Sequence, residues 1–402
     1  MRFDLREANW LTAERICIFS LVALAFSTFV IGALFWTATG LLDVAGHPIG
    51  TDFANVWTAG TWVLDGQPAA PFDPKLHAAR QLEIFHTPDK SYYGWHYPPM
   101  FLGIATLLAL MPYIPALITW QLATLALYLN VVYRIYPDRL SLLAALAFPA
   151  VVVNLLHGHN GFLTAALFGG GLLVLPRNAI VAGVLFGLLS YKPQFALAIP
   201  IALIAGGYWR AFFAAGLTAV TLAALSWAAF GTETWAAFFH FSEFTRTVVL
   251  EQGNTGWHKI QSVFASVRMH GGSIAAAYVA QSAMTVAVLA GVFVLWRSTA
   301  PHAIKAAALL VAALLSTPYV LDYDLMILGP AVAFLVQHGR AEKFLQYEKS
   351  ILAFCWVMPM VARIISEATL VHIGVLTLIG LFGLCLAKGL ELNFKSRELA
   401  HE

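Results

Sequence analysis

Long apolar runs separated by short polar breaks dominate the chain. The runs are continuous, without the alternation of lipid-facing and lumen-facing residues that marks a membrane β-barrel. Many approach the roughly 17–25 residues with which a helix crosses a bilayer. The pattern therefore predicts an all-α polytopic membrane protein with about 12 spans (roughly 11–13), at residues 15–37, 114–133, 140–156, 161–175, 179–191, 194–207, 211–230, 274–296, 303–316, 324–337, 350–367 and 371–388.

The first run, residues 15–37, is predicted to be a spanning helix. A signal peptide is the alternative, but its apolar region is usually only about 7–15 residues long. No clear A-x-A cleavage site accompanies this run. We therefore expect the segment to remain as the first span.

The apolar run 98–111 is short and lies between Pro99 and Pro112, which favours a re-entrant or interfacial helix. Charge supports that interpretation. If the N-terminus is cytoplasmic and this run does not cross, 15 of the 23 Lys and Arg residues face inward, most of them in short loops, as the positive-inside rule expects. These are Arg2, Arg6, Arg15, Arg134, Arg139, Arg177, Arg210, Arg297, Lys305, Arg340, Lys343, Lys349, Lys388, Lys395 and Arg397.

The same topology places the chemically richest loops on one outer face. We predict a single membrane domain, residues 1–402, whose catalytic face is formed by outer loops 38–96 and 231–273, with shorter outer loops at 156–160, 190–194 and 316–324. Acidic residues in the first loop include Asp65, Asp73, Glu83 and Asp89.

Composition agrees with a lipid environment. Hydrophobic residues make up 60% of the chain and charged residues 11%, against about 25% charged residues in soluble domains. The net charge of +2, without a basic tract or phosphate-binding glycine loop, argues against nucleic acid. Cys17, Cys355 and Cys385 lie inside apolar runs and are expected to be core residues.

Asp52 is the leading candidate for chemistry. It lies just outside the first span, beside Gly50, Phe53 and Trp57. Partial burial there would raise its pKa and make it a better general base. The alternative is an N-cap for a helix over residues 53–64, a position that Asp favours.

Several short motifs follow Asp52 in order. They are Tyr97-Pro98-Pro99, His159-Asn160-Gly161 with Phe162-Leu163, Tyr191-Lys192-Pro193-Gln194, Ser316-Thr317-Pro318-Tyr319 and Asp322-Tyr323-Asp324. Together with Asp52 the series resembles glycosyltransferase family 87, also called domain of unknown function 2029, of the GT-C superfamily. That family includes polyprenol-phosphate-mannose-dependent α-mannosyltransferases. The resemblance extends over about residues 50–330, and His159 departs from the glutamine usual in the family.

The resemblance implies a bundle of about 11–13 helices whose first outer loop packs over a lipid-facing groove. It implies transfer of a sugar, with inversion, from a polyprenyl-phosphate carrier to an acceptor hydroxyl, with Asp52 as the base. One carboxylate can suffice, because a phosphate leaving group is stable as an anion. No cofactor is expected. The partners would be the lipid-linked donor, a lipid or glycan acceptor and membrane lipid, at the periplasmic or external face of a bacterial inner membrane.

The departing phosphate would need cations or hydrogen-bond donors. Lys192 is the strongest candidate, because Pro193 breaks the helix beside it near membrane depth, where ionisable groups are costly and often functional. A snorkelling lysine is the alternative. Gln194 would be its amide partner. The further candidates on the outer face are Arg246, His258, Lys259, Arg268 and His157.

The remaining candidates each have two interpretations. His157, His159 and Asn160 could contact sugar hydroxyls, cap helices, or join an aspartate in a metal site, which nothing in the spacing demands. Asp322 and Asp324 point to different helix faces, so one could reach the site while the other caps. His258 is the preferred second catalytic residue, although loop 231–273 would equally suit a solvated loop. The other expected binding residues are Tyr97, Tyr319 and Trp57, the last with Trp62 and Trp95 as sugar-stacking or interfacial aromatics.

Two other functions compete with this prediction. A transporter or lipid flippase would have polar groups in helices of both halves and an inverted repeat, and neither pattern is found. A non-catalytic assembly subunit with a degenerate site is the third interpretation, which intact Asp52 and Lys192 oppose. The sequence therefore favours a membrane glycosyltransferase.

Overall fold

The computed structural model describes residues 4–88 and 92–398, with side chains described to residue 392. Arg2, Asp89 and the side chains of Lys395 and Arg397 lie outside the described residues. The described part is helical, with isolated bridges and no strand. Its α-helices are α1 Ala13–Thr37, α2 Thr51–Leu64, α3 Pro74–Phe85, α4 Leu102–Ala109, α5 Tyr113–Ile135, α6 Arg139–Leu146, α7 Pro149–His157, α8 Gly161–Val174, α9 Ala179–Leu188, α10 Ala198–Ala205, α11 Trp209–Phe244, α12 Val263–Met269, α13 Ile274–Arg297, α14 His302–Leu315, α15 Leu328–Ala341, α16 Glu348–Thr369 and α17 Ile373–Glu398.

Short turns of tighter or wider helix connect these elements. A π-helical turn, η5 Thr245–Glu251, continues α11. The 3₁₀ turns are η1 Ala70–Phe72, η2 Pro99–Phe101, η3 Leu189–Tyr191, η4 Pro193–Phe195, η6 Trp257–Lys259 and η7 Asp322–Ile327. Prolines begin η2 and η4, a position where proline is tolerated because it lies in the first helical turn.

Membrane-spanning helices are evident from length and composition. Within the described residues, six helices are long and apolar enough to cross a membrane, and α6 with α7, bent by 44°, would make a seventh span. These observations establish a helical membrane protein. Several other predicted spans correspond to shorter apolar helices of 10–17 residues, among them α8, α9 with η3, η4 with α10, and α14. The count of about 12 spans and their orientation stay predictions.

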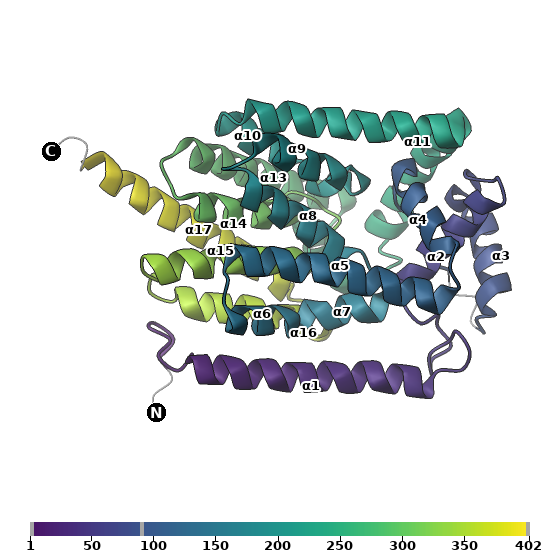
Figure 1. Cartoon of the computed structure of the whole chain (residues 1–402), viewed down its shortest axis with the longest axis horizontal. Coiled ribbons are helices and arrows are strands. Elements are labelled where there is room, and N and C mark those ends of the chain that lie inside the picture. The colour runs from purple at the N-terminus through teal and green to yellow at the C-terminus, as the bar shows by residue number, and fades with distance from the viewer. Residues whose placement is uncertain (1–3, 89–91, 399–402) are drawn as a thin grey trace.

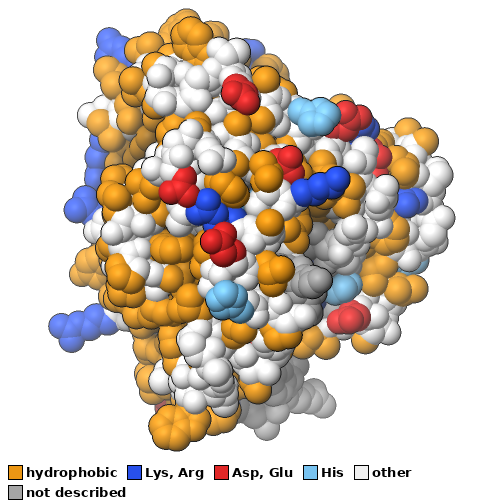
Figure 2. All heavy atoms as spheres, turned by 90° about the vertical axis from the view of Figure 1, so that its right-hand side faces the viewer, with side chains coloured by type: hydrophobic (Ala, Val, Ile, Leu, Met, Phe, Trp, Pro, Cys, Tyr) orange, Lys and Arg blue, Asp and Glu red, His pale blue; other side chains and the backbone are white. Residues whose placement is uncertain are grey.

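The helices form an elongated bundle with distinct ends (Figure 1). Helices α2, α3 and α4 lie at one end, called here the α2–α3 end, where α1 finishes and α5 begins. The first residues of α1 and the junction of α5 with α6 lie at the other end. Charged side chains of both signs and histidines are visible on the face of the α2–α3 end (Figure 2).

The run 98–111 forms η2 and α4, which pack closely against α2. A Cβ atom built on Gly60 would lie only 2.1 Å from the Ala105 carbonyl oxygen, so glycine permits the close contact between the two helices. Phe101 of η2 and Trp95 are fully buried, and their rings stack with centroids 5.9 Å apart. An aromatic core therefore supports the first loop.

The second large loop is more helical than expected. Helix α11 continues past the predicted end of its span at residue 230, with a break at Gly231, where φ is 81°. Left-handed φ values favour glycine. Beyond the break, Phe241 packs edge-on against Phe72 of the first loop. The apolar face of this segment explains why it remains a helix instead of becoming a solvated loop.

Candidate active site

The site begins at the contact between the first turn of α2 and the end of α7. Gly50 precedes α2 with φ of 73°, and Gly158 follows α7 with φ of 64°. A Cβ atom built on Gly158 would lie 2.5 Å from the Phe53 Cβ and 3.4 Å from the Gly50 Cα. Two glycines therefore allow the two backbones to approach closely.

A hydrogen bond fixes the same junction. Thr51 Oγ1 and His157 Nδ1 are 2.8 Å apart, and these side chains come from positions 106 residues apart. Thr51 was not singled out from the sequence, because its partner is brought near only by the packing of α2 on α7. Because Asp52 directly follows Thr51, this bond brings His157 close to Asp52.

Asp52 is the second residue of α2 and does not cap it. The N-cap is Gly50, so the capping interpretation from sequence is wrong. The Oδ2 oxygen of Asp52 is buried and accepts no hydrogen bond from the described residues. Burial raises the pKa of this carboxyl from 3.8 to about 6, while the charge of His157 lowers it and that of Asp322 raises it. The chemical consequence is a carboxylate that can accept a proton near neutral pH.

Lys192 and Asp324 form a buried ion pair. Lys192 Nζ donates to Asp324 Oδ1 at 2.7 Å, and their side chains are 4% and 3% exposed. Asp324 Oδ2 accepts from the Leu321 amide at 3.0 Å, so this aspartate also caps η7. Lys192 is thus a fixed internal cation, in place of a snorkelling side chain. Both groups contribute to the electrostatic environment of Asp52.

The rings of His159 and Tyr323 stack on each other in the same region. His159 stacks on Tyr323 with centroids 3.5 Å apart, and its Nε2 lies 3.4 Å from the Tyr97 hydroxyl. Asp322, which is 6% exposed, accepts from the Tyr323 amide at 2.9 Å. Tyr97, His159 and the Asp322–Asp324 segment, which are distant in sequence, are therefore brought together.

Two buried asparagines differ in their side-chain hydrogen bonds. Asn154 of α7 donates to the Tyr323 carbonyl at 3.0 Å and accepts from the Gly161 amide at 3.0 Å, so it joins α7, α8 and η7. It was missed from sequence because one asparagine in an apolar run is a weak signal. Asn160 is buried, and neither side-chain atom has a partner in the described structure. A buried amide left unpaired is costly, and a ligand hydroxyl would satisfy it.

The second loop contributes Lys259 to this region. Lys259 is half-buried; burial and the charge of Arg363 lower its pKa, and the charges of Asp322, Asp52 and Glu367 raise it. The charges of Glu367 and Arg363 of α16 also act on His258, its neighbour in η6. Asp322 also influences His258, but Asp52 is not among its main influences. Of these two neighbours, Lys259 is the one on which the charge of Asp52 acts.

Two further predicted residues lie at the edge of this group. Tyr319 is partly buried, and its ring is 6.4 Å from that of His96. The charges of Asp324 and Asp52 both act on its hydroxyl. Gln194 is partly buried in η4, two residues after Lys192. No hydrogen bond between the side chains of Gln194 and Lys192 is present in the described structure.

Two predicted loop cations are engaged elsewhere. Arg246 pairs with the Glu251 carboxylate at 3.0 Å and is 55% exposed. Arg268 donates to the Glu251 carbonyl at 3.0 Å and lies over the Trp257 ring at 4.7 Å. The structure therefore joins them to each other through Glu251, and these contacts stabilise the second loop.

The three tryptophans of the first loop make structural contacts. Trp57 Nε1 donates to the Met111 carbonyl at 3.0 Å, and the Trp62 ring lies 4.0 Å from the Arg80 guanidinium carbon. Trp95 is fully buried, so neither sugar stacking nor an interfacial position describes it. Among the described residues, no group of three His, Cys, Asp or Glu side chains is arranged to hold a metal ion.

Comparison with known families adds a direct finding to this geometry. The model of glycosyltransferase family 87 matches residues 95–318, more than half of the chain. The chain belongs to glycosyltransferase family 87. It is therefore a glycosyltransferase, with a sugar donor and an acceptor as its substrates. No curated protein matches the chain, and no solved structure does.

The family 87 match covers part of the site. Tyr97, His159, Asn160 and Lys192 lie within the matched residues. Asp52 lies before the match, and the Asp322–Asp324 segment lies after it. The Thr51–His157 hydrogen bond and the Lys192–Asp324 ion pair join the segments that carry these outside residues to the matched region.

Proposed function

We propose that this family 87 protein transfers a sugar, mannose by its resemblance, from a polyprenyl-phosphate donor to an acceptor hydroxyl on a lipid or glycan, with inversion. The observation that carries the proposal is the buried Oδ2 oxygen of Asp52, which has no hydrogen-bond partner among the described residues, in a carboxyl whose pKa is about 6. A carboxylate in that state is suited to accept a proton near neutral pH.

The proposed reaction needs one proton acceptor. The acceptor oxygen attacks the anomeric carbon and forms the glycosidic bond, while the bond from that carbon to the phosphate oxygen breaks. The electron pair leaves with polyprenyl phosphate, and the acceptor proton passes to Asp52. Attack from the face opposite the phosphate inverts the anomeric configuration.

Cations would stabilise the leaving phosphate. Lys259 makes no ion pair in the described structure, and its charge is within electrostatic range of Asp52 and Asp322. Lys192 is held by Asp324 at 2.7 Å, so it supplies a fixed positive charge. We assign Lys259 as the phosphate ligand and Lys192 as a fixed cation of the same site, because preorganised charge stabilises a transition state without rearrangement.

The same proposal gives the other polar groups a role. The buried Asn160 amide has no hydrogen-bond partner within the described residues, and the neighbouring His159 contacts the Tyr97 hydroxyl. These groups would hold sugar hydroxyls. We place the reaction at the periplasmic or external face of a bacterial inner membrane, with the N-terminus cytoplasmic, on the basis of the distribution of Lys and Arg.

The decisive experiment measures sugar transfer in proteoliposomes. Radiolabelled mannosyl-phosphoryl-polyprenol and an acceptor lipid extract are supplied to wild type, Asp52→Asn and the control Asp73→Asn. Asp73 is an exposed N-cap of α3 in the same loop, and asparagine also caps well. We expect at least about 100-fold loss for Asp52→Asn, the low end for removing a general base, and little change for Asp73→Asn. Equal transfer by wild type and Asp52→Asn would refute the assignment of the base.

A further inference from the structure

A second feature lies at the end of the bundle opposite Asp52. Helix α1 stands apart from the other helices over much of its length (Figure 1). The space beside it is a groove of about 1230 Å³, lined almost entirely by apolar side chains of α1, α7, α16 and α17. Small-molecule pockets usually have about 300–1,000 Å³, so this groove suits a long-chain molecule.

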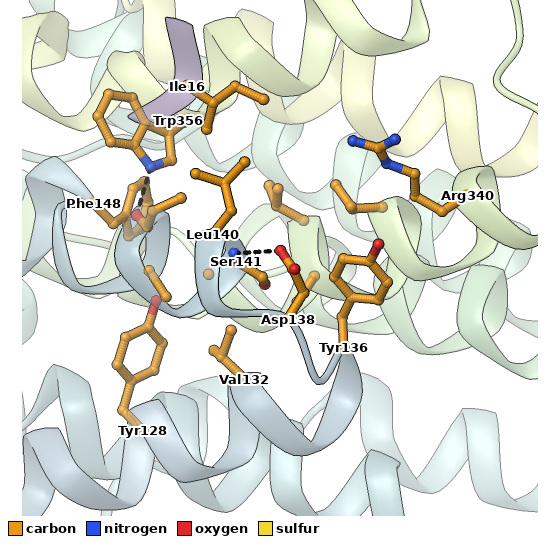
Figure 3. Close-up of a pocket in the computed structure, with 16 residues that line it drawn as sticks. Ile16, Tyr128, Val132, Tyr136, Asp138, Leu140, Ser141, Phe148, Arg340 and Trp356 are labelled. Atoms are coloured by element: carbon orange, nitrogen blue, oxygen red, sulfur yellow. Dashed lines mark hydrogen bonds between the residues drawn. The ribbon is translucent and has the colours of Figure 1, made fainter. Parts of the chain in front are cut away.

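The groove adjoins a smaller cavity with polar groups. The smaller cavity has about 140 Å³ and lies between α5, α6 and α15 (Figure 3). The two spaces share lining residues from α1, α6, α15 and α16, namely Ile16, Ala144, Val332, Val336 and Trp356. A molecule whose apolar chain lies in the groove could therefore place its polar end in the cavity.

Opposite charges line the cavity without pairing to each other. The Arg340 guanidinium and the Asp138 carboxylate extend toward the same space (Figure 3). Arg340 makes no ion pair among the described residues, and the only side-chain bond of Asp138 there is from the Ser141 amide at 3.0 Å. Tyr128 lines the same cavity, and its buried hydroxyl has no hydrogen-bond partner in the part of the chain that the structure describes. A ligand with both signs of charge would fit these groups.

We propose that the groove and cavity bind one zwitterionic phospholipid with a primary-amine headgroup. The acyl chains lie along α1, the phosphate faces Arg340 and the ammonium faces Asp138. Arginine hydrogen bonds well to phosphate oxygens, and a primary ammonium donates hydrogen bonds to a carboxylate. A quaternary ammonium has no N–H to donate, and a purely anionic headgroup would leave Asp138 opposed to negative charge.

This site is independent of sugar transfer. Its groups come from the end of the bundle that carries the first residues of α1 and the junction of α5 and α6, whereas Asp52 lies at the α2–α3 end (Figure 1). Helix α1 buries little of its surface against the other helices. A lipid bound in the groove would fill the space between α1 and the rest of the bundle.

Native mass spectrometry of the full chain in a non-ionic detergent tests the proposal. The delipidated protein is offered equal amounts of phosphatidylethanolamine, phosphatidylcholine and phosphatidylglycerol with identical acyl chains. We expect retention of one copy of phosphatidylethanolamine, preferred by roughly tenfold over each competitor, the effect of one charge-assisted hydrogen bond. Equal retention of all three would indicate only surrounding bilayer lipid and would overturn the proposal, as would preference for phosphatidylglycerol.

Matched variants locate the headgroup. Arg340→Gln and Asp138→Asn should each abolish the preference, and asparagine preserves the cap on α6. Arg139→Gln, which changes an exposed cation beside Asp138 that does not line the cavity, should retain it. A preference unchanged in Arg340→Gln would refute the headgroup assignment.

Variants of α1 locate the acyl chains. Ala23 lines the groove, and Phe29 does not and is 73% exposed. We expect Ala23→Trp to lower lipid retention and Phe29→Trp to leave it unchanged. Retention by Ala23→Trp equal to that of wild type would exclude the groove. The competition between lipids on wild-type protein needs no variant, so misfolding of one variant does not decide the result.

Discussion

Lys192 Nζ donates to Asp324 Oδ1 at 2.7 Å, across 132 residues of chain and inside the protein. Breaking a buried pair leaves an uncompensated charge and costs about 3–5 kcal/mol. Lys192→Met should therefore lower thermal stability strongly in detergent. The double variant Lys192→Met/Asp324→Asn should recover much of that stability, because it removes both charges while the asparagine side chain retains the shape of Asp324.

Sugar transfer by the double variant separates structure from chemistry. If Lys192 supplies charge to the leaving phosphate, the stable double variant should still transfer sugar at least about 10-fold more slowly, the effect of about 1.4 kcal/mol. Recovery of both stability and transfer would show that the ion pair is only structural. Thermal unfolding and initial rates on the same preparations make the comparison.

Transfer should depend on pH through Asp52. Burial holds its pKa at about 6, above the ordinary 3.8, so the carboxyl is protonated and unable to accept a proton below that pH. We expect the rate to rise with pH and to reach half its maximum near pH 6. The residual rate of Asp52→Asn should lack this step. A half-maximal rate below pH 4.5 in wild type would contradict the assignment.

Gly158 should be essential for positioning Asp52. A Cβ atom there would meet the Phe53 Cβ at 2.5 Å, and φ is already 64°, so Gly158→Ala should displace α2. A displacement of about 1 Å can cost about 100-fold in rate, and we expect a loss of that order. Gly103→Ala is the control, because open space surrounds Gly103. Wild-type rates for both variants would refute this role.

The Thr51–His157 hydrogen bond should make a smaller contribution. Thr51→Val removes it with little change in shape, and a hydrogen bond is worth about 0.5–1.5 kcal/mol. We expect kcat to fall by roughly 2- to 12-fold, and Thr51→Ser to recover most of it. A loss shared equally by valine and serine would point to packing of the Thr51 methyl group.

Trp57 should act as a structural residue. Its indole N–H donates to the Met111 carbonyl at 3.0 Å, and its ring meets Tyr113 edge-on. Trp57→Phe should therefore lower stability by about 0.5–1.5 kcal/mol, the value of one hydrogen bond, and leave KM for donor and acceptor unchanged. A raised KM with unchanged stability would restore the sugar-stacking interpretation.

The features predictable from sequence are those that depend on local pattern. Continuous apolar runs predicted an all-helical membrane protein, and the ordered motifs predicted family 87, and both are confirmed. The continuation of α11 past Gly231 was not predicted. The apolar face of the continued segment is buried by packing against Phe72 of the first loop, and the sequence alone does not show that contact.

The details of the site required the packing of distant segments. Lys192 could be selected as an unusual cation, but its partner Asp324 could not, because two aspartates were equally near the start of the same segment. Arg246 and Arg268 had the right charge for phosphate, and only the structure shows both engaged with Glu251. Asn154 carries no sequence signal beyond one amide in an apolar run.

The close approach of Gly50 to Gly158 has a consequence for genetic analysis. Both positions lack side chains, so neither can touch a sugar through one, yet a change at either would move the base. In a screen of random variants for lost transfer with normal protein abundance, Gly158 would be recovered alongside Asp52. A map of inactivating alleles would therefore mark the α2–α7 junction as strongly as the reacting groups, and would reveal the geometry of the site without a bound substrate.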